Sequence, residues 1–225
     1  RKKAVELYKI LKKHHPDFSS PKLEKHTLFK KLYPGEEYND TLMRKLISEL
    51  YKSVERYFAY LNFMKDDFAF KHHLISEINI RGLDKETGIN IREAFKDLNN
   101  KPERNEDYYN KKNLLLEQEG WLLSNDFPKL YVNVQQAYEA YCNFFLITVL
   151  SYYLRVLNDN IYRDSGFKLD FMEELFLMLD DSKYLKIPAI AVNYYAIKSY
   201  RDIDDDESLY KFRDLLYKHG KQIGS

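Results

Sequence analysis

The sequence predicts an all-α protein of stacked antiparallel helical hairpins, arranged as an α-solenoid or a multi-helix bundle, with no significant sheet. Apolar residues recur every three or four positions along most of the chain, which is the period of a helix that buries one face. Only seven glycines and six prolines occur among 225 residues. No strand of alternating polarity and no Asn-Gly or Asp-Gly hairpin turn is found. About nine or ten helices joined by short loops account for this pattern.

Residues 1–62 are predicted to form a basic N-terminal subdomain of three helices. The first helix ends before Pro16, because proline does not fit a helix interior. The second covers the segment PKLEKHTLFKKL and stops at Pro34-Gly35. The third begins after Asn39 and Asp40. Its expected buried side recurs every three or four residues and consists of Leu42, Leu46, Leu50, Val54, Phe58 and Leu61.

Residues 63–225 are predicted to form a helical-hairpin repeat region, which packs by itself or continuously with the first subdomain. Gly82 and Gly220 are expected to end helices, and Pro188 is expected in the first turn of one. The segment 131–159 is long enough for one extended helix or two. The expected helices of this region are 66–81, 83–100, 108–123, 131–159, 167–179, 188–203 and 204–220.

Composition and charge narrow the class of protein. With 44% hydrophobic and 16% aromatic residues, the chain is too apolar for a disordered or low-complexity protein. Its frequent Lys, Tyr, Asn and Ile suit an AT-rich bacterial genome. Residues 1–60 carry 14 basic and 8 acidic side chains, a balance of +6, whereas residues 61–225 carry 22 and 27, a balance of −5. The basic part suits an anionic partner, and the alternative is an ordinary scatter of solvated charges.

The single cysteine, Cys142, excludes an internal disulfide and favours a reducing, cytoplasmic compartment. We expect it to be a small buried residue of a helix. The most apolar run, residues 142–154, is shorter than a membrane span and is flanked by charges, so it is predicted to be a buried core helix. No signal peptide is recognised. Because the chain begins with Arg1 and not with Met, we expect its native N-terminus to lie upstream.

A basic face is expected on the third helix, opposite its apolar stripe. Such a face suits the major groove of DNA, where guanidinium groups reach base edges and ammonium groups reach phosphates. Two acidic residues, Glu49 and Glu55, lie at the edges of the face and oppose this reading. The alternative is a core helix with a solvated basic side. The candidate nucleic-acid-binding residues are Arg44, Lys45, Ser48, Lys52 and Arg56.

The segment SSPKLEKHTLFKKLYPGEEYNDTLMRKLISEL, residues 19–50, resembles the front half of the winged-helix units that precede helical repeats in some bacterial regulators. The shared features are a short helix, a LFKKLYPG stop, and a helix with buried Leu and Ile and an exposed Arg-Lys pair. The resemblance implies DNA binding. It is incomplete, since the turn YPGEEYN is longer than a helix-turn-helix uses and the segment that follows has a helical pattern where a wing needs strands.

Three Tyr-Tyr pairs begin at Tyr108, Tyr152 and Tyr194, a spacing of 44 and then 42 residues that lies in the range of two-helix repeats. The last unit, residues 186–219, resembles a tetratricopeptide-type hairpin, although the small residues that let the family's helices approach closely are not matched. The resemblance implies partner binding. One hypothesis is that tyrosines of these pairs line a groove for a protein partner or peptide segment. The alternative is that one tyrosine of each pair packs between helices. The candidate partner-binding residues are Tyr108, Tyr152, Tyr194 and Tyr195.

The sequence contains no motif that predicts an enzyme, a cofactor or a metal. Its glycines form neither a GxxxxGK nor a GxGxxG loop, and neither CxxC nor HExxH occurs. The acidic run DIDDDE is explained by a helix N-terminus, where carboxylates are favoured. We therefore expect a non-enzymatic protein–protein interaction scaffold or adaptor, with no membrane partner. The alternative is a nucleic-acid-binding regulator that uses helix 41–60, with the helical remainder as its partner or sensor module.

Overall fold

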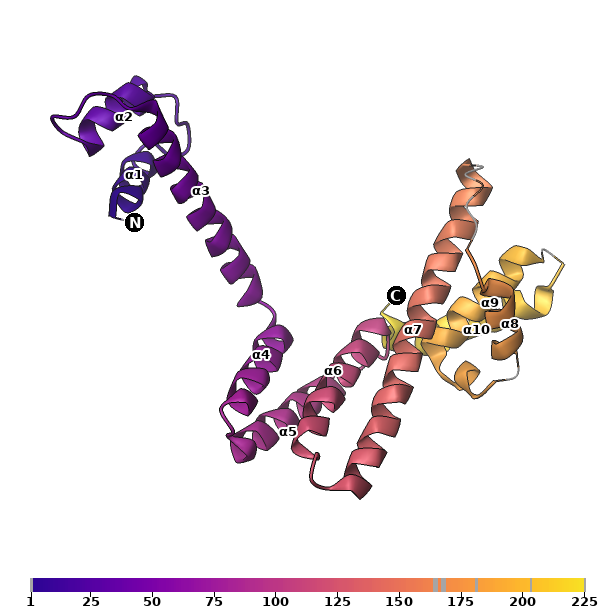
Figure 1. The fold of residues 1–225 in the computed structure, drawn as a ribbon. Coiled ribbons are helices and arrows are strands. Elements are labelled where there is room, and N and C mark those ends of the chain that lie inside the picture. Colours follow the sequence, from indigo (N-terminus) through magenta and orange to yellow (C-terminus); the bar gives the residue numbers. More distant parts are fainter. Residues whose placement is uncertain (1, 164–165, 167–168, 181, 203, 225) are drawn as a thin grey trace. The chain divides into compact units, whose positions relative to one another are not determined.

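The computed structural model describes residues 2–163, 166, 169–180, 182–202 and 204–224. Over these residues the chain forms ten α-helices and two short 3-10 helices, with no strand, so the prediction of an all-α fold is confirmed (Figure 1). The chain divides into two compact units, Arg1–Phe70 and Lys71–Ser225. The division lies a little after residue 62, where the sequence analysis placed it, and falls within α4 (Asp67–Ile80).

The first unit contains α1 (Lys2–Lys12), η1 (Pro21–Leu23), α2 (Lys25–Leu32) and α3 (Asp40–Phe63). Helix α3 begins at Asp40, one residue earlier than expected, and Asn39 before it accepts a hydrogen bond on its side-chain oxygen from the backbone N–H of Leu42 at 2.9 Å. Apolar side chains from all three α-helices meet in one small core. Its buried members are Ala4, Leu7, Leu28, Phe29, Leu32, Met43 and Leu46.

The expected buried side of α3 is wrong in its second half. Met43 and Leu46 are its buried residues, whereas Phe58 is 63% exposed and Leu61 is 39% exposed. The cause is length: α3 has 24 residues, and its partners in the unit, α1 and α2, have 11 and 8. The short helices cover only the start of α3, so the periodic apolar pattern continues where nothing in this unit packs on it.

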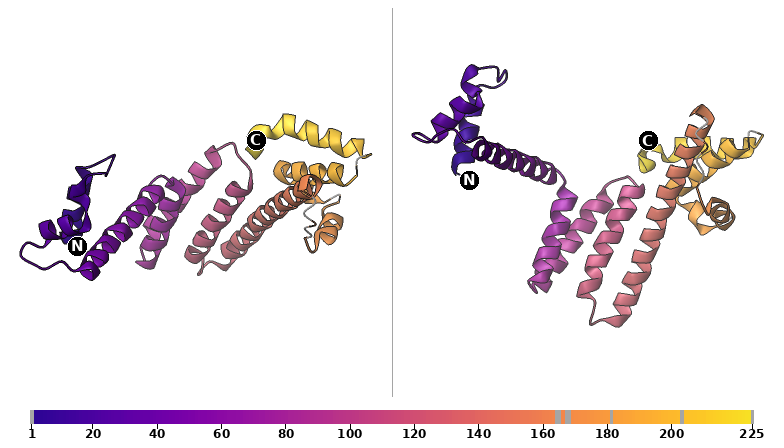
Figure 2. Two further views of the ribbon diagram at one scale, coloured as in Figure 1. Left: turned by 90° about the horizontal axis from the view of Figure 1, so that it is seen from above. Right: turned by 45° about the horizontal axis from the view of Figure 1, so that its top comes forward.

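The second unit continues with α5 (Asp84–Asn100), α6 (Glu106–Leu122) and α7 (Phe127–Arg163). These helices run up and down as antiparallel neighbours, and Figure 2 shows them side by side. The segment expected as one helix or two is a single helix of 37 residues. Gly82 has a positive φ of 69° and follows the end of α4, as expected.

The unit closes with α8 (Met172–Leu179), η2 (Lys183–Lys186), α9 (Pro188–Arg201) and α10 (Asp206–Ile223). Pro188 lies in the first turn of α9, as expected. The expected helix end at Gly220 is wrong, because α10 continues to Ile223 and ends at Gly224, which has a φ of 78°. The larger core lies among α7, α8 and α9. Its buried members are Leu146, Ile147, Leu150, Met172, Leu175, Phe176, Leu179, Ala189, Ile190, Tyr194 and Ile197.

A glycine permits close packing between α6 and α7. A Cβ atom added to Gly120 on α6 would lie 3.1 Å from the side-chain oxygen of Asn133 on α7. The amide nitrogen of Asn133, which is 5% exposed, donates a hydrogen bond to Glu119 at 3.1 Å. Gly88 on α5 differs, since an added Cβ atom would lie 3.5 Å from the side chain of Arg92 and 3.7 Å from that of Leu122, which are ordinary van der Waals contacts. A side chain at position 120 would therefore crowd Asn133, whereas one at position 88 would make only ordinary contacts.

We expect Gly120→Ala to lower the free energy of unfolding by about 1 kcal/mol, because crowding of Asn133 outweighs the helix-propensity gain. Gly88→Ala is the matched control and should raise the free energy of unfolding by about 0.5–1 kcal/mol. Urea unfolding followed by circular dichroism measures both. Equal stabilisation by the two substitutions would contradict the close approach of α6 and α7.

Candidate interaction surface

Helix α7 has one buried side, which is divided between two neighbours. Asn133 faces α6 through its hydrogen bond to Glu119. Farther along the helix, Leu146, Ile147 and Leu150 enter the core with α8 and α9. Burial of each such aliphatic side chain contributes about 1.5–3 kcal/mol to stability. These contacts fix which side of α7 is turned away from the unit.

The opposite side of α7 carries a row of mostly exposed, large side chains, which we call the α7 seam. Its members follow one another at alternating intervals of four and three residues. Seven of them are exposed, from 41% at Phe145 to 73% at Tyr131, and Thr148 is half-buried. An average interval of 3.5 residues is the spacing at which two helices pack along their whole length in a coiled coil. The α7 seam consists of Phe127, Tyr131, Val134, Tyr138, Tyr141, Phe145, Thr148 and Tyr152.

The sequence analysis missed this seam. It treated residues 142–154 as a buried core helix, yet Phe145 and Tyr152 of that run are 41% and 56% exposed. Cys142, expected to be buried, is of intermediate exposure. The available signal was the alternation of four and three from Phe127 onward, which the long apolar run obscured because α7 is apolar on more than one side.

The positions beside the seam carry no charge. On the side toward α6 lie Leu130, Ala137, Phe144 and Ser151, and on the other side lie Gln135, Cys142 and Val149. Charged side chains at these flanking positions normally set partner choice in coiled coils. On α7 itself, therefore, no charged side chain flanks the seam; the nearest carboxylate of the groove is that of Glu117 on α6.

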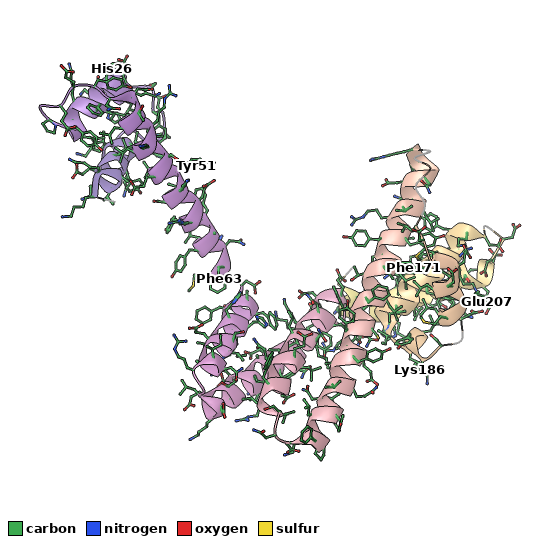
Figure 3. All side chains as sticks on the ribbon, viewed as in Figure 1. His26, Tyr51, Phe63, Phe171, Lys186 and Glu207 are labelled. Atoms are coloured by element: carbon green, nitrogen blue, oxygen red, sulfur yellow. The ribbon has the colours of Figure 1, made fainter. Side chains whose placement is uncertain are left out.

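Two phenols near the middle of the seam, those of Tyr138 and of Tyr184 on η2, are held in their uncharged form. A hydrogen bond with Cys142 raises the pKa of Tyr138, and burial followed by the charge of Cys142 raises the pKa of Tyr184 on the adjacent η2. Both phenols therefore stay protonated at neutral pH and keep a hydroxyl that can donate a hydrogen bond. Near the middle of the seam, Phe171 stacks on Phe145 with ring centroids 6.5 Å apart; Figure 3 labels Phe171 beside α7.

A groove of about 500 Å³ runs between α6 and the seam. Trp121 of α6, which is 72% exposed, lines it together with Val134, Tyr138 and Tyr141 of the seam. Asn113 also lines it and donates a hydrogen bond to Glu117 at 3.0 Å. The groove thus combines aromatic walls with a few polar groups, as protein sites that receive another side chain commonly do.

The candidate tyrosines do not share one surface. Tyr108 and Tyr194 are buried: the hydroxyl of Tyr108 donates to Asn99 at 2.9 Å, and that of Tyr194 donates to Asp180 at 2.7 Å. Tyr195 is half-buried, and Tyr152 is exposed in the α7 seam. For the pairs that begin at Tyr108 and Tyr194, the structure matches the alternative in which one tyrosine packs between helices. The first tyrosine of these two pairs is therefore not available to a partner groove.

The five candidate basic-face residues of α3 are all exposed. The guanidinium group of Arg44 lies 2.6 Å from the carboxylate of Asp40, one helical turn earlier. The hydroxyl of Tyr38 donates to Asp40 and, as the main cause, lowers the pKa of that carboxyl. The side chain of Arg56 lies by a groove between α1 and α3, and that of Lys45 by a separate hollow with Lys2. The structure thus presents Arg44, Lys45, Ser48, Lys52 and Arg56 to solvent, with one of them in an ion pair.

Across the part of the chain that the structure describes, no group of three or more His, Cys, Asp or Glu side chains is placed to hold a metal ion. One helical stretch, Phe127–Asn160, is long and apolar enough to cross a membrane by length and composition. This stretch is the one that carries the α7 seam.

The chain matches no protein-family model, and no curated protein or solved structure is similar to it.

Proposed function

We propose that the protein is a non-enzymatic interaction scaffold that receives a helical segment of a protein along the α7 seam. The observation that supports this most strongly is the alternation of four and three residues over eight positions, seven of them exposed. A 3.5-residue interval suits a second helix lying at a shallow angle, because its side chains then meet every member of the row. A short extended peptide would contact only part of it.

The chemistry of the surface favours a protein partner over a lipid one. Four of the eight seam residues are tyrosines, whose rings offer contact area and whose hydroxyls offer hydrogen bonds at protein interfaces. Beside the seam, α6 packs on the first half of α7 and brings the carboxylates of Glu117 and Glu119 with it. Placing these carboxylates at the depth of lipid chains would cost several kcal/mol.

The architecture agrees with an adaptor. Neighbouring antiparallel helices α5 to α7 and the hairpin of α9 and α10 support the resemblance to tetratricopeptide-type repeats, which implies partner binding. We infer a cytoplasmic role in a bacterial cell from the single cysteine and from the composition.

A photo-reactive phenylalanine analogue placed at Tyr138, in the cells that make the protein, tests this function. We expect it to give a covalent adduct with a protein chain, because Tyr138 is 61% exposed in the middle of the seam. The matched control places the same analogue at Tyr217 of α10, which is 85% exposed and lies outside the seam. Equal adduct yields at the two positions, or an adduct with lipid only, would overturn the proposal.

A second candidate function, nucleic-acid binding by the basic face of α3, is favoured by the exposure of all five of its residues. It ranks lower because Arg44 is already paired with Asp40, and because Glu55 lies among the basic side chains of the same face.

Fluorescence polarisation with random duplex DNA at low and moderate salt tests the second candidate. If the face binds phosphates, the affinity for DNA should fall about 10-fold or more from low to moderate salt. Binding releases counterions from the DNA, and this release is less favourable when the salt concentration is higher. Arg44→Glu with Lys52→Glu should abolish the binding, whereas Lys218→Glu with Lys221→Glu on α10 makes the same change of charge and should not. Absence of binding at low salt would remove this candidate.

A further inference from the structure

We propose that the occupant of the α7 seam is a second copy of this chain, whose own α7 lies antiparallel to the first. This inference rests on the proposed function and names its partner. The seam offers what such a pair needs, since each copy supplies both an apolar row at 3.5-residue intervals and the helix that fits it. In the proposed register Phe127 of one copy lies level with Tyr152 of the other.

The sizes of the side chains support the antiparallel direction. In this register each seam residue lies level with a different seam residue of the second copy, and we call each such pair a layer. The two small residues, Val134 and Thr148, each oppose a large ring. Alternation of large and small residues across a helix pair gives dense packing without voids. The layers are Phe127 with Tyr152, Tyr131 with Thr148, Val134 with Phe145, and Tyr138 with Tyr141, each repeated by symmetry.

A parallel pair would place each residue level with its own counterpart. Thr148 would then oppose Thr148 and leave space unfilled, while Tyr131 would oppose Tyr131 and crowd the layer. Voids and overpacking each cost stability in a tightly packed interface. The antiparallel arrangement avoids the gap at Thr148 and the Tyr131 pair, and it joins two large rings only in the Phe127–Tyr152 and Tyr138–Tyr141 layers.

Charge supports the same direction. The antiparallel register brings Arg155, which follows the seam, to the level of the turn before α7 in the second copy. That turn holds Asp126, whose side chain caps the start of α7 by accepting from the backbone N–H of Lys129. Arg155 therefore approaches a carboxylate at both ends of the pair, a carboxylate that also forms an ion pair with Lys129 of its own chain at 2.7 Å. In a parallel pair Arg155 would meet Arg155.

The uncovered area is large enough for a stable dimer. An aromatic side chain buries about 150–250 Å² when fully covered, and the seven exposed seam residues are about half exposed or more, except Phe145. Together they offer on the order of 800 Å² per copy, which is the usual contribution of one partner to a stable interface. Leaving such an apolar patch in water is unusual for a monomer.

Sedimentation velocity of the full chain, from about 1 to about 100 µM, tests the proposal. We expect a dimer of the wild type and an increase in Kd of about 100-fold or more for Val134→Glu with Tyr138→Glu, since buried carboxylates would face the second copy. Tyr217→Glu is the matched control, because Tyr217 is exposed on α10, and it should leave the dimer unchanged. Circular dichroism checks that each variant keeps its helices.

Two outcomes would overturn the inference: a wild type that stays monomeric at the highest concentration, or a dimer that survives the double substitution. These are distinguishable from failure of the proposed function. If the chain is monomeric but the photo-reactive group at Tyr138 still captures a different protein, the scaffold function stands and the self-pairing is wrong. If the chain is monomeric and the photo-reactive group at Tyr138 captures no protein, the self-pairing and the scaffold function are both wrong.

Cross-linking tests the direction and the register. In a Cys142→Ser background, one variant carries Tyr131→Cys and another carries Thr148→Cys, and a short bis-maleimide reagent joins cysteines that lie close together. The proposed register predicts a cross-linked dimer only in the mixture of the two variants, because like positions lie roughly 25 Å apart along the helix axis. A cross-link in either variant alone, or none in the mixture, would contradict it.

Discussion

Helix α7 has more apolar surface than its neighbours cover, and this imbalance is the constraint on which the rest of the structure depends. A 37-residue helix cannot be covered by one partner of half its length. Helix α6, with 17 residues, lies along its first part, and α8 and α9 cover one side of its second part. These helices leave the seam largely exposed, because the core with α8 and α9 lies on the other side of α7 and α6 packs on one flank of the seam.

The packing that orders the second unit therefore also creates the surface that it offers to a partner. Gly120 lets α6 approach Asn133 closely, and the α6–α7 groove with its polar residues follows from that approach. The core around Ile147 and Leu150 holds the second half of α7 by its other side. Since both contacts fix the rotation of one rigid helix, the seam is ordered before any partner arrives, which lowers the entropy cost of binding.

Local signals were enough to predict most of the fold. Asn39 before α3, Gly82 after α4 and Pro188 at the start of α9 are recognisable because each acts through neighbouring backbone groups. The helix end at Gly220 failed for a related reason: two glycines lie close together near the end of α10, and only the structure shows that Gly224 takes the left-handed conformation.

The site was harder to predict, because periodicity reports that a helix has an apolar side and not whether anything covers it. The Leu46 and Phe58 positions of α3 follow one pattern, yet one is buried and the other is 63% exposed. The Tyr-Tyr pairs posed the same problem. The first tyrosine of one pair, Tyr194, belongs to the core, while the first tyrosine of another, Tyr152, faces solvent. Whether the apolar side of a helix is covered depends on helices that are distant in the sequence. No local sequence pattern therefore predicts it.

The most direct test of this account is hydroxyl-radical footprinting of individual tyrosines in dilute and in concentrated protein. In dilute protein, Tyr138 and Tyr141 should react about as fast as the exposed Tyr217, while the buried Tyr108 and Tyr194 stay protected. At high concentration, protection should appear at the seam tyrosines and not at Tyr217. If Tyr138 and Tyr141 were as protected as Tyr194 in dilute protein, α7 would have no uncovered face and the account would be wrong.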